Sequence, residues 1–167
     1  MKEKIINALN WRYATKIFDP SKKISKENIN TILESARLSP SSNGIEMWKF
    51  LVIENPEIRA RLKEASFNQP KVTDASHLVV IAYRTDIVEN TSKERLERTA
   101  KTQNQDISEL AGLKNMIDGS ISQKEHDGTL DAWVKAQTYI PLGIMIETAS
   151  LLDIDNCAME GLSLIHI

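Results

Sequence analysis

A continuous apolar run, Leu78 to Tyr83, is the feature that most limits what this chain can fold into. The run has the length of a strand and no polar alternation, which predicts a strand covered on both faces. Trp48 to Ile53 is aromatic and β-branched and is followed by Asn55-Pro56, so it predicts a second strand. Helical patterns fill much of the remaining chain, which predicts an α/β or α+β class in which helices dominate.

Helical spacing predicts the elements around these strands. Apolar residues three and four apart predict a helix over residues 2–10. A second helix begins at Ser25 with Asn28, carries an apolar stripe over residues 29–36 and ends at Ser39-Pro40. The polar residues 68–74 predict a loop or a single helical turn.

A further helix is predicted from Glu57 to Ala65, with Ile58 and Leu62 facing inward. Asn156 to Met159 is a candidate for one more strand. These two segments complete the set of short elements next to the predicted sheet.

Two longer segments occupy the second half of the chain. The forty residues after Tyr83 are polar, with weak helical character at 94–96 and 110–117. We expect helices there, within a mobile, solvent-rich excursion. Asp131 to Leu152 is rich in apolar residues and predicts one long helix. Pro141 should kink this helix, because proline has no backbone N–H to donate.

Composition excludes several classes of function. The 21 basic and 23 acidic residues nearly balance, which argues against a protein that wraps nucleic acid, and 5% aromatic residues argue against a base-stacking surface. The single cysteine, Cys157, excludes an intrachain disulfide and fits a reducing compartment. No signal-peptide pattern is present, and the apolar stretch from Tyr139 to Leu152 is shorter than the roughly 20 residues of a spanning helix. We therefore expect a cytoplasmic protein.

Common cofactor and metal motifs are missing from the sequence. The six glycines form neither a G-x-G-x-x-G pattern nor a Walker loop, and the three histidines are too scattered to predict a zinc site. Cys157 lies among apolar residues and is interpreted as a packed small side chain rather than a nucleophile. Ser41 and Ser42 lack the G-x-S-x-G context of a hydrolase nucleophile.

The segment Arg12-Tyr13-Ala14-Thr15-Lys16 places two cations four residues apart. In an extended chain, Arg12, Ala14 and Lys16 lie on one face. A guanidinium group and an ammonium group on one face suit an elongated anionic ligand, because the guanidinium fork grips phosphate while the ammonium reaches a second oxygen. The alternative for this segment alone is a pair of solvated surface charges.

Three further pieces follow this segment in order. They are Ser39-Pro40-Ser41-Ser42-Asn43 with Trp48-Lys49-Phe50, Asn68-x-x-Lys71 with Asp74-Ala75-Ser76-His77, and Met159-Glu160-Gly161. Together, the four pieces resemble the FMN-dependent nitroreductase family, homodimeric NAD(P)H reductases of nitroaromatics, quinones and dihydropteridines. The resemblance covers residues 3–161. It implies an α+β fold with helices around a small mixed sheet and FMN at the subunit interface.

The resemblance assigns the first cofactor contacts to the segment after the first helix. Arg12 would contact the FMN phosphate, and Lys16 the ribityl chain and the pyrimidine edge of the flavin. Tyr13 and Ala14 belong to the same cofactor-binding motif. Ala14 stands where the family commonly has serine, which removes one hydroxyl donor from the phosphate side.

The later motifs are assigned to the flavin ring. Asn68 and Lys71 would reach the N1, O2 and N3 side, where a cation stabilises the anionic reduced flavin. Glu160 and Gly161 match a turn whose backbone N–H groups approach N5 and O4, and glycine permits the close contact.

Pro40, Ser41 and Ser42 resemble the loop that crosses from the second subunit to cover the same flavin, so a homodimer is implied. The implied reaction is ping-pong: NAD(P)H delivers a hydride to the flavin and leaves, and a planar acceptor then takes the electrons. Because the protein supplies placement and electrostatics, no catalytic residue and no metal is assigned.

The largest departure from the family pattern follows Gly161. The family continues there with a helix, a core strand and an arm that embraces the partner, whereas residues 162–167 match nothing in that pattern. We therefore expect residues 1–161 to be an incomplete nitroreductase-like domain and residues 162–167 to be a non-family tail. A natural short variant is the alternative.

Two other functions stay open from the sequence. The chain could be a non-catalytic fragment that binds FMN weakly or not at all, because loss of a core strand exposes a sheet edge and apolar helix faces. It could also be a regulatory protein that uses the same cations to bind a phosphate ligand. Retention of flavin through gel filtration separates the enzyme from the fragment.

Overall fold

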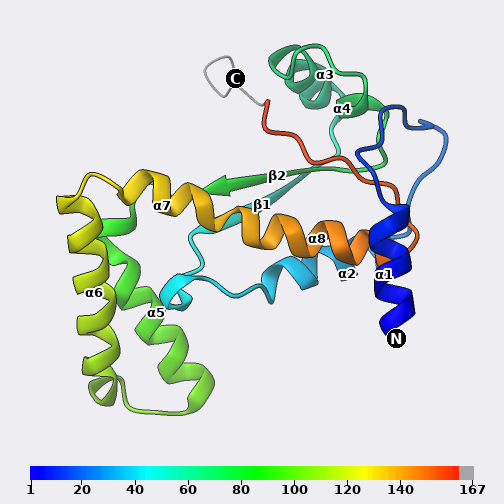
Figure 1. Ribbon diagram of the computed structural model, residues 1–167. Helices are drawn as coiled ribbons and strands as arrows, with labels where there is room; N and C mark the ends of the chain where they lie inside the picture. The colour runs from blue at the N-terminus through cyan, green and yellow to red at the C-terminus, as the bar shows by residue number, and fades with distance from the viewer. Residues whose placement is uncertain (162–167) are drawn as a thin grey trace. The chain divides into compact units, whose positions relative to one another are not determined.

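The computed structural model describes residues 1–161, apart from the side chains of residues 88 and 89. Helices predominate and two strands form one small sheet, so the predicted α+β class is confirmed (Figure 1). Residues 162–167, predicted as a non-family tail, lie outside the described residues. Within the described chain, none of the helices is long and apolar enough to cross a membrane.

The elements are α1 (Lys2–Trp11), α2 (Lys26–Arg37), β1 (Trp48–Ile53), α3 (Pro56–Ala65), α4 (Lys71–Asp74), β2 (Leu78–Tyr83), α5 (Ile87–Gln103), α6 (Ala111–His126), α7 (Leu130–Gln137) and α8 (Tyr139–Leu151), with 3₁₀ turns at Ser42–Gly44 and Ile107–Leu110.

The chain divides into two compact units. The first unit contains residues 1–39, residues 50–81 and the described residues from 141 onward, and the second unit contains residues 40–49 and 82–140. Each unit has its own cluster of buried apolar side chains. Of the predicted cofactor residues, Pro40, Ser41 and Ser42 belong to the second unit and the others to the first.

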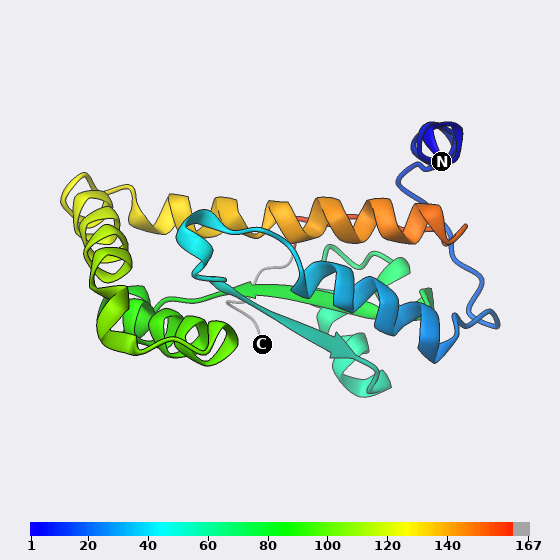
Figure 2. The ribbon, with the colours of Figure 1, turned by 90° about the horizontal axis from the view of Figure 1, so that it is seen from below.

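The two strands begin and end at the residues that the sequence predicts. They are neighbours in the sheet, and their arrows run in opposite directions (Figure 2). The Arg84 N–H, directly after β2, donates to the Met47 carbonyl, directly before β1, at 3.0 Å, as expected of an antiparallel pair. Every residue of β2 is half-buried, so the predicted cover on both faces is partial.

The core of the first unit lies between α2 and α8. The predicted cap of α2 is confirmed, because the Ser25 Oγ accepts a hydrogen bond from the Asn28 N–H at 3.1 Å. Apolar side chains of both strands pack against these two helices. The buried members are Ile32, Ala36, Met145 and Ala149, and Phe50, Val79, Ile81, Leu33, Leu152 and Ile154 are half-buried against them.

The predicted long helix over residues 131–152 is two helices, because the chain breaks at Thr138 between α7 and α8. Pro141 explains the position of the break. Its missing N–H would have paired with the Gln137 carbonyl, and its ring disfavours a continuous helix through that carbonyl. Pro141 instead lies in the first turn of α8, where an N–H is not needed.

The helices predicted after β2 are present in the second unit, and they are longer than the sequence pattern indicates. Residues 87–103 and 111–126 form two full helices, α5 and α6, where the sequence indicated only weak helical character. The apolar residues of α5 and α6 are few and widely spaced, so the sequence shows only a weak helical periodicity. In the structure, these residues pack in one buried cluster. That cluster contains Ile45, Met47, Ile87, Leu96, Leu110, Ile117, Ile121 and Val134.

Two smaller predictions are wrong. Asn156 to Met159 is not a strand, because only Asn156 makes an isolated β-bridge, to Ala14. On α3, Leu62 is buried as predicted, but Ile58 is 42% exposed and Arg59 is 6% exposed. A charged residue thus occupies the inward position that hydrophobicity had assigned to an isoleucine.

Candidate functional site

The segment after α1 is extended and anchored to the residues that follow α8. Ala14 forms a parallel β-bridge with Asn156, and the Thr15 N–H donates to the Asn156 carbonyl at 3.2 Å. The Thr15 hydroxyl, on a buried side chain, donates to the Asp155 carboxylate at 3.0 Å. The Thr15 side chain therefore lies on the inward face of the segment. In an extended chain, the side chains of Ala14 and Lys16 lie on the opposite face.

Arg12 carries a hydrogen-bond donor that the protein does not use. The side chain is half-buried, and its Nε is buried without a partner among the described residues. An unsatisfied buried N–H costs about 1–3 kcal/mol, which a ligand oxygen would recover by accepting from it. Lys16 is exposed on the same segment. Both side chains donate and neither accepts, so this end of the first unit suits an anionic ligand.

Lys71 joins this segment from another direction. It is the first residue of α4, and its Nζ lies 3.3 Å from the Cys157 Sγ. Cys157 directly follows the residue that pairs with Ala14, so residues 155–157 contact both cationic pieces. Cys157 is half-buried, and its sulfur contacts an ammonium group.

Asn68 lies on a strained turn between α3 and α4. Phe67 and Asn68 have φ angles of 55° and 54°, in the left-handed region that costs an L-residue roughly 1–2 kcal/mol. The Asn68 N–H donates to the Lys63 carbonyl at 3.0 Å, which holds the turn closed. Gly161 approaches from the end of the described chain: a Cβ there would lie 2.6 Å from the Phe67 Cε2. Glycine therefore permits this approach.

Arg59 on α3 binds the backbone of α4 and of the residues that follow it. Its Nε donates to the Val72 carbonyl at 2.8 Å, one Nη to Ala75 at 2.5 Å and the other to Ser76 at 3.3 Å. Burial lowers the pKa of the guanidinium. These bonds occupy carbonyl groups that the short helix leaves unpaired, so Arg59 positions the helix that begins with Lys71.

The first unit therefore brings three predicted pieces together on residues 155–161. Ala14 and Thr15 contact the start of this stretch, Lys71 contacts its middle, and Phe67, next to Asn68, contacts its end. Arg59 and Cys157 were missed as supporting residues. Neither carries a sequence signal, because a buried arginine on a helix and a cysteine in an apolar segment look ordinary. The predicted residues of this unit are Arg12, Tyr13, Ala14, Lys16, Asn68, Lys71, Glu160 and Gly161, of which Tyr13, Lys16, Asn68 and Glu160 are exposed.

The predicted loop of Pro40, Ser41 and Ser42 belongs to the second unit. The Ser42 N–H donates to the Gln137 Oε1 at 2.8 Å, and the Ser41 Oγ accepts from the Glu46 N–H at 2.9 Å. Pro40 is exposed. The buried amide of Gln137 at the end of α7 thus holds the loop in place, a contact between residues far apart in the sequence.

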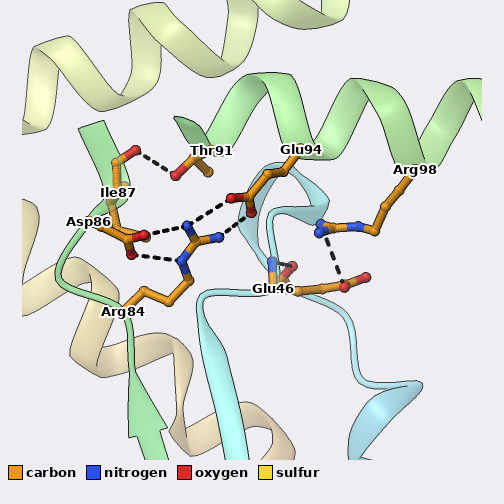
Figure 3. A network of polar contacts seen from close by, with 8 residues as sticks. Glu46, Arg84, Asp86, Ile87, Thr91, Glu94 and Arg98 are labelled. Carbon is orange, nitrogen blue, oxygen red and sulfur yellow. Dashed lines mark hydrogen bonds and ion pairs between the residues drawn. The ribbon is translucent and has the colours of Figure 1, made fainter. Parts of the chain in front are cut away.

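Charged side chains of the second unit form a network next to this loop (Figure 3). Arg84 donates to the Asp86 carboxylate at 2.9 and 2.8 Å and to Glu94 on α5 at 2.5 and 3.2 Å. Arg98, one turn further along α5, lies 3.6 Å from the Glu46 carboxylate. The hydrogen bonds from Arg84 lower the pKa of Asp86 to about 2. The network borders a hollow of about 390 Å³ lined by Lys49, Arg84, Asp86 and Glu94 among others.

His77 is engaged in local contacts at the start of β2. Its Nδ1 lies 2.9 Å from the Ser76 Oγ and its Nε2 lies 3.6 Å from the Glu54 carboxylate. Burial lowers the pKa of the imidazole. Across the residues that the structure describes, no group of three or more His, Cys, Asp or Glu side chains could hold a metal ion.

Comparison with known proteins gives a consistent result. The model of the nitroreductase family matches residues 9–166. A relative from Staphylococcus aureus (strain USA300), named "Putative NAD(P)H nitroreductase SAUSA300_2462", is 42% identical over 167 residues, covering 98% of this chain and 75% of its own.

Solved structures show the same fold at lower identity. The crystal structure of a "putative nitroreductase ydfN" from Bacillus subtilis has a TM-score of 0.85 at 16% identity, covering 99% of this chain and 79% of its own. The crystal structure of a "putative nitroreductase in complex with FMN" from Exiguobacterium sibiricum has a TM-score of 0.77 at 23% identity, covering 98% of this chain and 77% of its own.

Proposed function

The chain belongs to the nitroreductase family, and we propose that it is an FMN-dependent NAD(P)H oxidoreductase of nitroaromatics, quinones or related planar acceptors, acting by a ping-pong hydride mechanism. The observation that carries the proposal is the unused buried donor of Arg12, on a segment joined through residues 155–157 to Lys71. The names of the relatives and the FMN complex of a structural neighbour support the choice of donor and cofactor.

The residues of the first unit suit FMN in charge. Arg12 offers donors to the phosphate, and the exposed ammonium of Lys16 is free to reach the ribityl chain and the pyrimidine edge. When bound, FMN would supply a hydride acceptor and donor. Ala14 lacks the hydroxyl donor that the family commonly has here, so more of the phosphate affinity falls on Arg12.

Lys71 and Asn68 would serve the flavin ring. The Lys71 ammonium, fixed by Arg59 through α4 and by its contact with Cys157, provides the cation for the N1 and O2 side. The left-handed turn at Asn68 holds this exposed amide in one place, and strain of this kind clusters at ligand sites. Glu160 and Gly161 would bring backbone N–H groups to N5 and O4.

A homodimer is part of the proposal, because Pro40, Ser41 and Ser42 would cover the flavin of the other subunit. Large apolar side chains around the Arg12 segment favour a partner surface there, since Trp11, Tyr13 and Ile17 are exposed. None of the residues of α1 is buried within its own chain. A second copy would remove this surface from water.

The test is an absorbance spectrum of the protein expressed with riboflavin and passed through gel filtration, followed by an NAD(P)H oxidation assay with a quinone and a nitroaromatic. Flavin bands that coelute with a dimer, together with acceptor-dependent oxidation, are expected. A flavin-free protein that also fails to bind added FMN would overturn the proposal in favour of a non-catalytic fragment. Retention of phosphate ligands without NAD(P)H oxidation would favour a regulatory phosphate-binding protein.

A further inference from the structure

The arginines of the second unit differ in what they pair with. Arg84 is bonded to two carboxylates and Arg98 is paired with Glu46. Arg95, on α5 between the residues that make these contacts, has no ion pair among the described residues, and its Nε is buried without a hydrogen-bond partner. The carboxylates of Glu46, Asp86 and Glu94 are thus paired with Arg84 or Arg98 and not with Arg95.

The Arg95 guanidinium lies directly against the loop that follows Ser42. A Cβ on Gly44 would lie 2.8 Å from the Arg95 Nη2 and 2.9 Å from its Cζ, so a larger residue at position 44 would displace the guanidinium from this place. Gly44 has a φ of +65°, a conformation that also favours glycine. The backbone of the loop therefore serves as the surface on which the guanidinium rests.

The same loop contributes a second unused donor. The Nδ2 of Asn43 is buried without a hydrogen-bond partner among the described residues. Asn43 has a φ of 56°, so its backbone is in the left-handed conformation. Asn43 directly precedes Gly44, against which the Arg95 guanidinium lies. Each of the two buried donors costs about 1–3 kcal/mol when unsatisfied, a cost that an acceptor supplied by a ligand would recover.

An anionic oxygen group is the acceptor that fits. Guanidinium groups only donate, and they bind carboxylates and phosphates through two parallel hydrogen bonds. The amide of Asn43 adds a donor without adding charge. Pro40, Ser41 and Ser42 immediately precede Asn43, so one donor belongs to the loop that the proposed function assigns to the partner's flavin. The other donor, Arg95 on α5, lies against the same loop at Gly44.

We propose that Asn43, Gly44 and Arg95 form a subsite for the phosphate or carboxylate group of a substrate that reacts at the flavin. The proposal rests on the proposed function for the identity of the substrates. Two sources carry this chemistry, the phosphates of NAD(P)H and the carboxylate of an acidic planar acceptor. The subsite would raise the affinity for one of them without contacting the reacting atoms.

The experiment compares Arg95→Gln with Arg98→Gln, a matched change on the same helix at an arginine that is already paired. Calorimetric titrations of the flavin-loaded protein with NADP⁺, NAD⁺ and 4-nitrobenzoate, with nitrobenzene as the uncharged counterpart, separate the sources. Arg95→Gln should weaken the binding of at least one anionic ligand by about 10- to 100-fold, the loss of one charge-assisted hydrogen bond or a pair of them. Nitrobenzene binding and FMN retention should be unchanged.

The ligand that is affected identifies the source. A loss for NADP⁺ and NAD⁺ assigns the pyrophosphate, a loss for NADP⁺ alone assigns the 2′-phosphate, and a loss for 4-nitrobenzoate alone assigns an acidic acceptor. Asn43→Gly, which keeps the left-handed φ and removes the amide, should weaken the same ligand by a smaller factor.

Equal affinities in Arg95→Gln, Arg98→Gln and the unmodified protein for every anion would overturn the subsite while leaving the proposed function intact. If the unmodified protein holds no FMN, the proposed function fails, and the same titrations on the flavin-free chain still decide whether Arg95 binds NADP⁺ or 4-nitrobenzoate.

Discussion

Arg59 and Arg12 belong to the same compact unit and have opposite hydrogen-bond environments. Arg59 is the more deeply buried of the two, and its guanidinium donates to three backbone carbonyls around α4. Arg12 is half-buried, and its Nε has no acceptor in the described chain. A guanidinium group that donates all its hydrogen bonds to the backbone stabilises the fold. A guanidinium group with an unsatisfied donor is available to bind a ligand.

The same contrast separates Arg84 from Arg95 in the second unit. Arg84 is held by two carboxylates, and Arg95 rests on the Gly44 backbone with its Nε unsatisfied. The difference between Arg84 and Arg95 shows that the role of an arginine cannot be inferred from its position in the sequence. The acceptors that surround it decide whether its removal affects folding or binding.

The largest expected effect is on the folding side of the comparison. Arg59→Met should lower the free energy of unfolding by about 3 kcal/mol, because three charge-assisted hydrogen bonds are lost and their carbonyls stay partly buried. Urea denaturation of the flavin-free protein measures the loss. Arg61→Met, at an exposed position of the same helix, should change stability by less than about 0.5 kcal/mol. A similar small change in both variants would mean that the bonds of Arg59 contribute little.

A pH series sharpens the contrast at Arg84. Hydrogen bonds from Arg84 depress the pKa of Asp86 to about 2 from a usual value of 3.8, so this pair stabilises the fold above about pH 4. The contribution should be lost as pH falls from 4 through 2. The difference in urea midpoint between the unmodified protein and Asp86→Asn should therefore shrink across this window. A difference that stays constant from pH 6 to pH 2.5 would contradict the ion pair.

The smallest expected effect concerns the turn that displays Asn68. Phe67→Gly should raise the free energy of unfolding by about 0.5–1 kcal/mol, because glycine adopts the left-handed φ without strain and the ring is largely exposed. Phe67→Ala removes the same ring but keeps the Cβ, so it should show no gain. Thermal denaturation of both variants is the measurement. Equal stabilities of the glycine and alanine variants would show that the turn stores no strain.

Much of the fold is predictable from local pattern. Both strands, the Ser25 cap of α2 and the single helical turn at α4 follow from residue type and spacing. The break at Thr138 was predicted only as a kink, because the pattern indicates the proline but not whether packing will keep the helix continuous. Helices α5 and α6 were underestimated because their buried residues are far apart in the sequence.

The residues of the candidate site can be predicted from the sequence, but the contacts between them cannot. The order of four motifs indicates a family and therefore a cofactor, and the family match confirms the resemblance. The contact of Lys71 with Cys157 and the burial of Arg59 in place of Ile58 depend on segments distant in sequence, which no local pattern encodes. Whether a donor is left unsatisfied is likewise decided only when the chain is folded.

The distinction between consumed and unused guanidinium donors is tested most directly by titrating flavin-free protein with FMN while following flavin fluorescence. Arg12→Ala is expected to raise the Kd for FMN by about 10- to 100-fold, since one or two charge-assisted bonds to the phosphate are lost. Its unfolding free energy should change by less than about 1 kcal/mol. Lys49→Ala, which removes an exposed cation outside the site, should leave the Kd within about twofold. Equal affinities in the Arg12 and Lys49 variants, or an Arg12 variant that fails to fold, would contradict the assignment of Arg12 to a ligand.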